Sequence, residues 1–111
     1  MNTPVFQYAT DKDGRPAAHP IAGAHPELAA YLTEEASWPD YVDVLADSLA
    51  KPAVPGHPAV HSGNAWAATV HADHVTLDHL HRKDHKRATV PRAVFAQALG
   101  EWRDFLAKTA P

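Results

Sequence analysis

The segment ATVPRAVFAQALGEWRDFLAK, residues 88–108, carries the most regular hydrophobic pattern in the chain. Its larger apolar side chains recur at i, i+1, i+4, i+5, i+8, i+11 and i+12, which is the spacing of one face of an α-helix. They are Val94, Phe95, Ala98, Leu99, Trp102, Phe105 and Leu106. Pro91 precedes them at a position that the first turn of a helix tolerates. The pattern predicts an amphipathic helix over residues 91–108, and the rest of the chain must cover its apolar stripe.

Two further helices are predicted in the first half of the chain. HPELAAYLTEEAS has a proline and a glutamate in its first turn and Leu28, Tyr31 and Leu32 on one face, which predicts a helix over residues 26–36. SWPDYVDVLADSLAKP predicts a second helix over residues 39–51, which Pro52 would end. We expect its inner stripe to consist of Tyr41, Val44, Leu45 and Leu49.

The segment AWAATVHADHVTLDHL, residues 65–80, predicts a β-hairpin with a two-residue turn at Ala72–Asp73. Because side chains alternate along a strand, Trp66, Ala68 and Val70 should share a face with Val75, Leu77 and His79. His71 and His74 should then lie opposite each other on a polar face, beside Thr69, Thr76 and Asp78. This hairpin is expected to be the centre of the sheet.

The remaining segments predict a second hairpin and two loops. PVFQYAT and RPAAHP read as paired strands, with Gly14 in the turn between them. Residues 51–64, KPAVPGHPAVHSGN, contain three prolines and two glycines and predict a loop and candidate contact surface. HRKDHKR, residues 81–87, predicts an exposed turn before the last helix.

These elements predict an α+β fold for one domain spanning residues 1–111: a small antiparallel sheet with helices packed on one face. The larger apolar side chains, Trp38 and Val44 among them, are the candidates for its core.

Several classes of chemistry are excluded or lack support. The chain has no cysteine, which excludes disulfides, thiolate zinc sites and cysteine nucleophiles. It has no phosphate-binding glycine loop, no His-Glu-x-x-His pair and no Gly-x-Ser-x-Gly elbow. No cofactor and no catalytic residue is therefore assigned. Neither a signal peptide nor a membrane-spanning stretch is evident, so we expect a cytoplasmic protein without membrane contact.

Charge is divided unevenly along the chain. The net charge of −3 argues against general nucleic-acid binding as a function. Residues 16–50 contain no lysine or arginine but six acids: Glu27, Glu34, Glu35, Asp40, Asp43 and Asp47. Residues 81–92 contain one acid and five basic residues: Arg82, Lys83, Lys86, Arg87 and Arg92. We expect an acidic pole and a smaller basic pole, which a partner of opposite charge could use.

Histidines are concentrated in residues 71–85, which hold five of the nine in the chain. The pair His71 and His74 supplies two metal ligands where a zinc site uses three or four, so no native metal is expected. A histidine-dependent hydrolase or nuclease that uses His71, His74 or the 79–85 turn remains an alternative, as does a metal-responsive regulator.

Residues 63–106, GNAWAATVHADHVTLDHLHRKDHKRATVPRAVFAQALGEWRDFL, resemble small bacterial proteins. The shared pattern is Gly-x-Ala-aromatic, a strand, a short turn, Val-x-Leu, a polar turn, and a helix with Phe, Leu, Trp and Phe-Leu. HPELAAYLTEEASWPDYVDVLADSLA, residues 25–50, is similar to their first half. Some of these proteins look like immunity proteins of contact-dependent or polymorphic toxin systems. The resemblance implies a non-enzymatic protein that binds a cognate toxin, although HRKDHKR stands where those proteins have an acidic turn.

An immunity function also has a physical rationale in the acidic segment. A nuclease active site is positively charged, and clustered carboxylates on an inhibitor steer its association with such a site. Aromatic side chains among the carboxylates could anchor the contact. The candidate partner-binding residues are Glu34, Glu35, Trp38, Asp40, Tyr41, Asp43 and Asp47. In the alternative interpretation, the two aromatic residues belong to the core and the acids merely face solvent. The oligomeric state is not predicted.

Overall fold

The computed structural model describes residues 3–51, 56, 58–81 and 87–109. An N-terminal hairpin of β1 (Phe6–Thr10) and β2 (Pro16–Pro20) is followed by helices α1 (Pro26–Glu35) and α2 (Pro39–Ala50). Four strands come next, β3 (Ala59–Ser62), β4 (Trp66–Val70), β5 (His74–His79) and β6 (Ala88–Pro91), and the last element is helix α3 (Arg92–Thr109). Strands β3 to β6 form one antiparallel sheet in the order β3-β4-β5-β6, and β1 and β2 form a separate pair.

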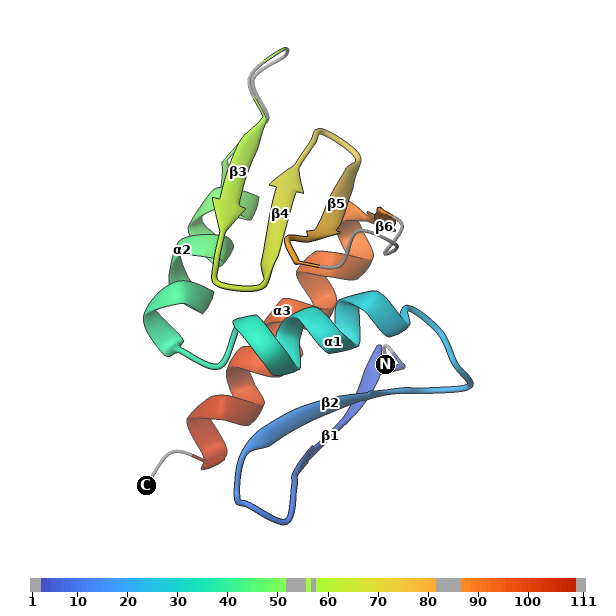
Figure 1. Ribbon diagram of the computed structural model, residues 1–111, viewed down its shortest axis with the longest axis vertical. Helices are drawn as coiled ribbons and strands as arrows, with labels where there is room; N and C mark the ends of the chain where they lie inside the picture. The colour runs from blue at the N-terminus through green and yellow to red at the C-terminus, as the bar shows by residue number, and fades with distance from the viewer. Residues whose placement is uncertain (1–2, 52–55, 57, 82–86, 110–111) are drawn as a thin grey trace.

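Helix α1 crosses the molecule between the four-stranded sheet and the β1–β2 hairpin (Figure 1). It contacts β2 on one side and β5 and β6 on the other, while α3 packs against α2 and against strands of both sheets. This arrangement confirms the predicted α+β class and the packing of the C-terminal helix on the sheet.

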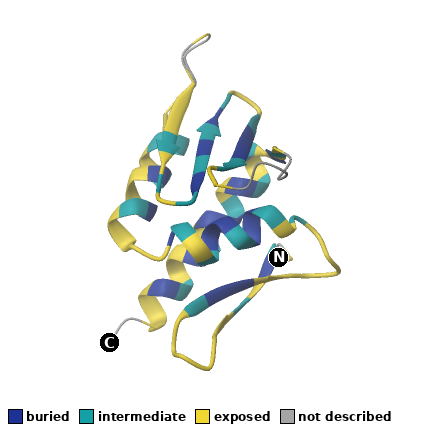
Figure 2. Ribbon diagram, viewed as in Figure 1, coloured by how far each residue is buried: buried dark blue, intermediate teal, exposed yellow. Residues whose placement is uncertain are grey.

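One hydrophobic core joins these elements, and its buried residues gather where α1, α3 and the four-stranded sheet meet (Figure 2). The predicted faces of the hairpin are confirmed, because Trp66 pairs with His79, Ala68 with Leu77, and Val70 with Val75. The core-facing residues predicted for α1, and most of the stripe predicted for α3, are also buried. The largest of these side chains are Leu28, Tyr31, Leu32, Phe95, Leu99 and Trp102.

Two strands were not predicted. β3 lies inside the segment that was expected to be a loop, and its pairing with β4 overrides the weak strand propensity of AVHS. β6 ends at Pro91, so the last helix begins one residue later than predicted, at Arg92. The sheet therefore has four strands. Residues 52–55 and 57 of the expected loop, and residues 82–86 of the expected turn, lie outside the described residues.

The inner face of α2 also differs from the prediction. Val42 and Leu45 are buried, whereas Val44 is 52% exposed. A short helix with apolar residues at positions 41, 42, 44, 45 and 49 offers two overlapping stripes at helical spacing, and packing on α3 selects the one through Val42. Trp38, a core candidate in the sequence, is 74% exposed and precedes the first turn of α2.

No helix in the described part of the chain is both long enough and apolar enough to cross a bilayer.

Candidate functional site

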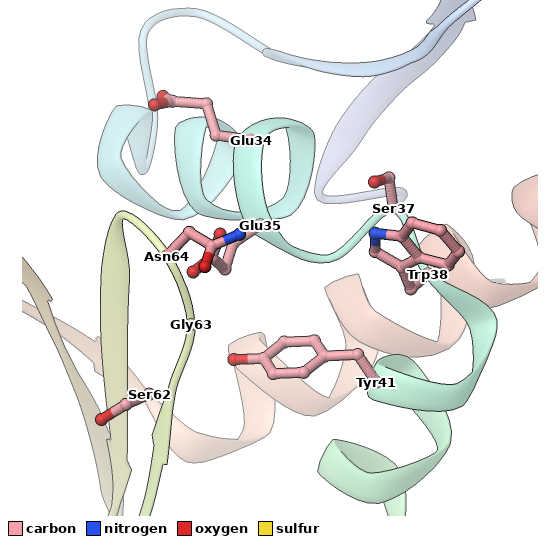
Figure 3. Close-up of a pocket in the computed structure, with 8 residues that line it drawn as sticks. All are labelled: Glu34, Glu35, Ser37, Trp38, Tyr41, Ser62, Gly63 and Asn64. Atoms are coloured by element: carbon pink, nitrogen blue, oxygen red, sulfur yellow. The ribbon is translucent and has the colours of Figure 1, made fainter.

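A hollow of about 210 Å³ lies where α1, α2 and the β3–β4 turn meet (Figure 3). The end of α1 contributes Glu34 and Glu35, and α2 with the residues before it contributes Ser37, Trp38 and Tyr41. The opposite wall consists of Ser62, Gly63 and Asn64. Four of the seven candidate partner-binding residues are therefore brought together: Glu34, Glu35, Trp38 and Tyr41.

The segment between α1 and α2 is hydrogen-bonded to a residue of the core. The indole Nε1 of the buried Trp102 donates a hydrogen bond of 2.7 Å to the carbonyl of Ala36. Trp38 has an extended backbone conformation at the N-cap of α2, and Pro39 restricts the first turn. The backbone under Trp38 is thus anchored, while its indole stays largely in solvent.

Glu35 connects the end of α1 to the β3–β4 turn. Its Oε1 accepts hydrogen bonds from the backbone N–H groups of Ala65, at 3.0 Å, and Trp66, at 3.4 Å. The carboxylate lies so close to Gly63 that a Cβ atom there would overlap it. Glu35 is therefore engaged in holding the turn, and the neighbouring Glu34 is the exposed carboxylate of this wall.

Tyr41 belongs partly to the core and partly to the hollow. Its hydroxyl lies 2.8 Å from the hydroxyl of the buried Tyr31 and donates a long hydrogen bond of 3.5 Å to the carbonyl of His61. Burial raises the pKa of both tyrosines above its usual value, so both hydroxyls stay neutral at physiological pH. The core interpretation thus holds for Tyr41 in part, but not for Trp38.

The other three candidate acids lie along α2 and do not line this hollow. Asp43 is turned toward α3, where its Oδ1 lies 2.9 Å from a guanidinium nitrogen of Arg103. Asp40 and Asp47 are exposed. They add negative charge to α2 without forming the wall of the hollow.

Trp38 also borders a second hollow of about 470 Å³. This one lies on the side of the β1–β2 turn, and Pro16, Pro39 and Leu106 make its lining more apolar. An exposed indole therefore stands between two hollows, one next to carboxylates and one lined by apolar groups. This arrangement can accept a protein surface by aromatic contact and charge.

The polar wall of the first hollow belongs to the segment predicted as a loop and candidate contact surface, but its position opposite α1 was not predicted. Ser62, Gly63 and Asn64 were assigned to a loop, and only their composition, SGN before a strand, signals a tight turn. Their approach to α1 depends on the unpredicted strand β3.

The histidines of residues 71–81 are distributed over separate places. The rings of His71 and His74 stack with centroids 4.3 Å apart, and His74 Nδ1 lies 2.6 Å from Asp73 Oδ1 at an exposed turn. This hydrogen bond lowers the pKa of the Asp73 carboxyl. His79 packs edge-on against Trp66, and His81 Nε2 lies 2.7 Å from the carbonyl of Asn64.

Among the described residues, no group of three histidine, aspartate or glutamate side chains could hold a metal ion. His57 and His85 lie outside those residues. The histidine-rich segment thus does not form a common site over the part that the structure describes.

Comparison of the chain with protein-family models, with curated proteins and with solved structures finds no match.

Proposed function

We propose that this protein is a non-enzymatic binding protein of the cytoplasm, and specifically an immunity protein that occludes the active site of a cognate toxin. The observation that carries the proposal is the exposure of Trp38, whose side chain stands between two hollows on an anchored backbone. Tryptophans that become buried in an interface are often its energetic anchors, and a rigid support lowers the entropy cost of binding.

The charge around Trp38 favours a basic partner. Glu34 and Asp40 are exposed on either side of it in the sequence, and Glu35 adds a partly buried carboxylate in the same hollow. A toxin that cleaves nucleic acid has a positively charged active site, so a negatively charged contact surface increases the rate of encounter. The rate gained in this way decreases as salt screens the charges.

We expect a gene for a toxin-like protein next to the gene for this protein, and the test is a binding measurement with its product. We expect a stable complex whose association rate falls with added salt. Trp38→Ala should raise the dissociation constant ~30-fold to ~1,000-fold, which corresponds to ~2–4 kcal/mol for an anchor residue. Cells that produce the toxin should survive with the wild-type protein and lose that protection with Trp38→Ala.

Val44→Ala is the matched control, because Val44 is also an exposed apolar residue of this region but lines neither hollow. Its dissociation constant should stay close to that of the wild type. Equal binding by Trp38→Ala and wild type, or no complex with the neighbouring gene product, would contradict the proposal.

A second candidate function is a histidine-dependent hydrolase, which the Asp73–His74 contact favours. A carboxylate that orients an imidazole through Nδ1 is the arrangement of many general bases. This function predicts phosphodiester or RNA cleavage that His74→Ala abolishes while the circular dichroism spectrum is unchanged. If the wild-type protein cleaves neither substrate, the hydrolase function is refuted and the binding function is the remaining candidate.

A further inference from the structure

Strand β3 has one edge that no strand of the described chain covers. In the β3–β4 turn, the N–H of Gly63 donates to the carbonyl of Trp66 at 2.8 Å. Hydrogen-bonded pairs alternate along an antiparallel ladder, so His61 directs its backbone groups toward β4. The N–H and C=O groups of Val60 and Ser62 consequently point away from the sheet.

The composition of β3 leaves this edge open to another strand. Within β3, AVHS contains neither a proline nor a lysine, the residues that commonly block edge pairing, and Pro58 lies just before the strand. Both outward residues are exposed, Val60 to 59%. An extended segment beside β3 would find two backbone donors and two backbone acceptors.

The edges of β6 and β2 are blocked. By the same alternation, Pro91 occupies an outward position of β6 and lacks an N–H group. On β2 the outward positions are Pro16, Ala18 and Pro20, and the N–H of Ala18 already donates to Thr33 Oγ1 at 2.9 Å. The edge of β3 therefore lacks the blocks to strand pairing that the edges of β6 and β2 have.

The open edge leads into the first hollow. Ser62 and the following Gly63 line it together with Glu34, Trp38 and Tyr41 (Figure 3). A strand added beside β3 would send every second side chain toward the face of the sheet that the helices cover. Side chains that reach the hollow would meet the exposed carboxylate of Glu34, so lysine or arginine fits there.

We propose that β3 accepts an extended, basic segment of a partner protein as a fifth strand of the sheet. The segment would pair with the outward groups of Val60 and Ser62 and place a cationic side chain in the hollow next to Glu34. This mode of recognition combines main-chain hydrogen bonds for affinity with side-chain pockets for specificity. The identity of the partner in this proposal rests on the proposed function, whereas the accessibility of the β3 edge does not.

Amide hydrogen exchange, measured residue by residue, tests the edge. In the free protein His61 should exchange slowly, because its N–H lies in the ladder, whereas Val60 and Ser62 should exchange rapidly. An acetylated eight-residue peptide of alternating lysine and valine, added at millimolar concentration, should slow exchange at Val60 and Ser62 at least tenfold. The matched peptide of glutamate and valine should leave both rates unchanged.

Val60→Pro removes an outward N–H and leaves the ladder hydrogen bonds of β3 in place. It should weaken binding of the lysine–valine peptide at least tenfold, while slow exchange at His61 reports that the strand is still formed. Val60→Thr, which keeps the N–H and the β-branched shape, should bind within twofold of the wild type.

Three outcomes would overturn the inference. One is unchanged exchange at Val60 and Ser62 with the basic peptide, and another is equal binding of the acidic peptide. The third is protection at Val60 and Ser62 in the free protein that increases with protein concentration, since a second copy would then occupy the edge. Failure of the proposed function would give a different result. Trp38→Ala would then still protect cells from the toxin, while the hydrogen-exchange results at β3 would be as expected.

Discussion

Arg92 joins three parts of the structure, and its replacement by alanine should be among the most destabilising changes at a partly exposed position. One guanidinium nitrogen donates to the carbonyl of His71 at 2.8 Å. Another donates to the carbonyls of Leu49 and Lys51, both at 2.9 Å. The first residue of α3 thus ties the β4–β5 turn to the C-terminal end of α2.

The magnitude follows from the number and kind of these bonds. A hydrogen bond that involves a charged group contributes ~1.5–3 kcal/mol, so three of them set an upper range of ~4.5–9 kcal/mol. Arg92 is only partly buried, and water can replace part of what is lost. The positive charge also complements the negative end of the α2 dipole, by ~0.3–1 kcal/mol. We expect Arg92→Ala to lower the free energy of unfolding by ~2–4 kcal/mol.

Urea unfolding followed by circular dichroism measures this change. Arg87→Ala is the matched control, since Arg87 belongs to the same basic segment but forms an exposed ion pair with Asp78 at 2.9 Å. Such surface pairs contribute ~0–1 kcal/mol. Arg92→Lys should be intermediate, because one ammonium group cannot reach all three carbonyls in the geometry of the guanidinium fork. If Arg92→Ala is no more destabilising than Arg87→Ala, the three contacts do not support the fold as argued.

Three further predictions concern glycine substitutions, the titration of His61 and the binding of zinc. Gly63→Ala should destabilise the protein by ~1–3 kcal/mol, because the new Cβ would overlap the Glu35 carboxylate that holds the turn. Gly100→Ala should stabilise it by ~0.5–1 kcal/mol, because its Cβ would enter open space on a helix, and urea unfolding compares the two variants. Burial lowers the pKa of His61, so its contribution to stability is complete above its unfolded pKa of ~6.5 and is lost as the pH falls through its lower folded pKa. Between pH 7.5 and pH 5, the melting temperature should therefore fall less for His61→Phe than for the wild type. Equal decreases in melting temperature would refute this. Titration calorimetry with zinc should show no tight binding, and heat that is lost in a variant lacking both His71 and His74 would contradict that expectation.

Much of the fold could be predicted because it depends on local pattern. The stripe of α3 and the alternation of the β4–β5 hairpin each determine which side chains are buried, and a two-residue turn sets the register. β3 and β6 could not be predicted in the same way. AVHS and ATVP are too short and too weakly apolar to show a period, and they become strands only because β4 and β5 offer them free edges.

The candidate site was predicted in part. The acidic and aromatic composition of residues 34–47 indicated its first wall, but the second wall requires β3 to bring Asn64 and its neighbours against α1. The basic segment was interpreted as a charged pole, yet Arg92 is committed to backbone carbonyls and Arg87 to Asp78. Sequence composition reports how many charges are present, and only the contacts report which of them are available to a partner.

Trp38 illustrates why exposure is more informative than residue type. Full burial of a side chain of this kind stabilises a fold by roughly 1.5–3 kcal/mol or more, and the buried Trp102 hydrogen-bonds to Ala36, two residues before Trp38. The bond from Trp102 to Ala36 fixes the preceding backbone, and Pro39 commits the chain to α2 immediately afterwards, so the indole is held outside the core. That stabilisation is available to a partner that covers Trp38. In the proposed complex, the two hollows beside Trp38 would receive the partner's own side chains, and the geometry that costs the free protein stability would supply the anchor.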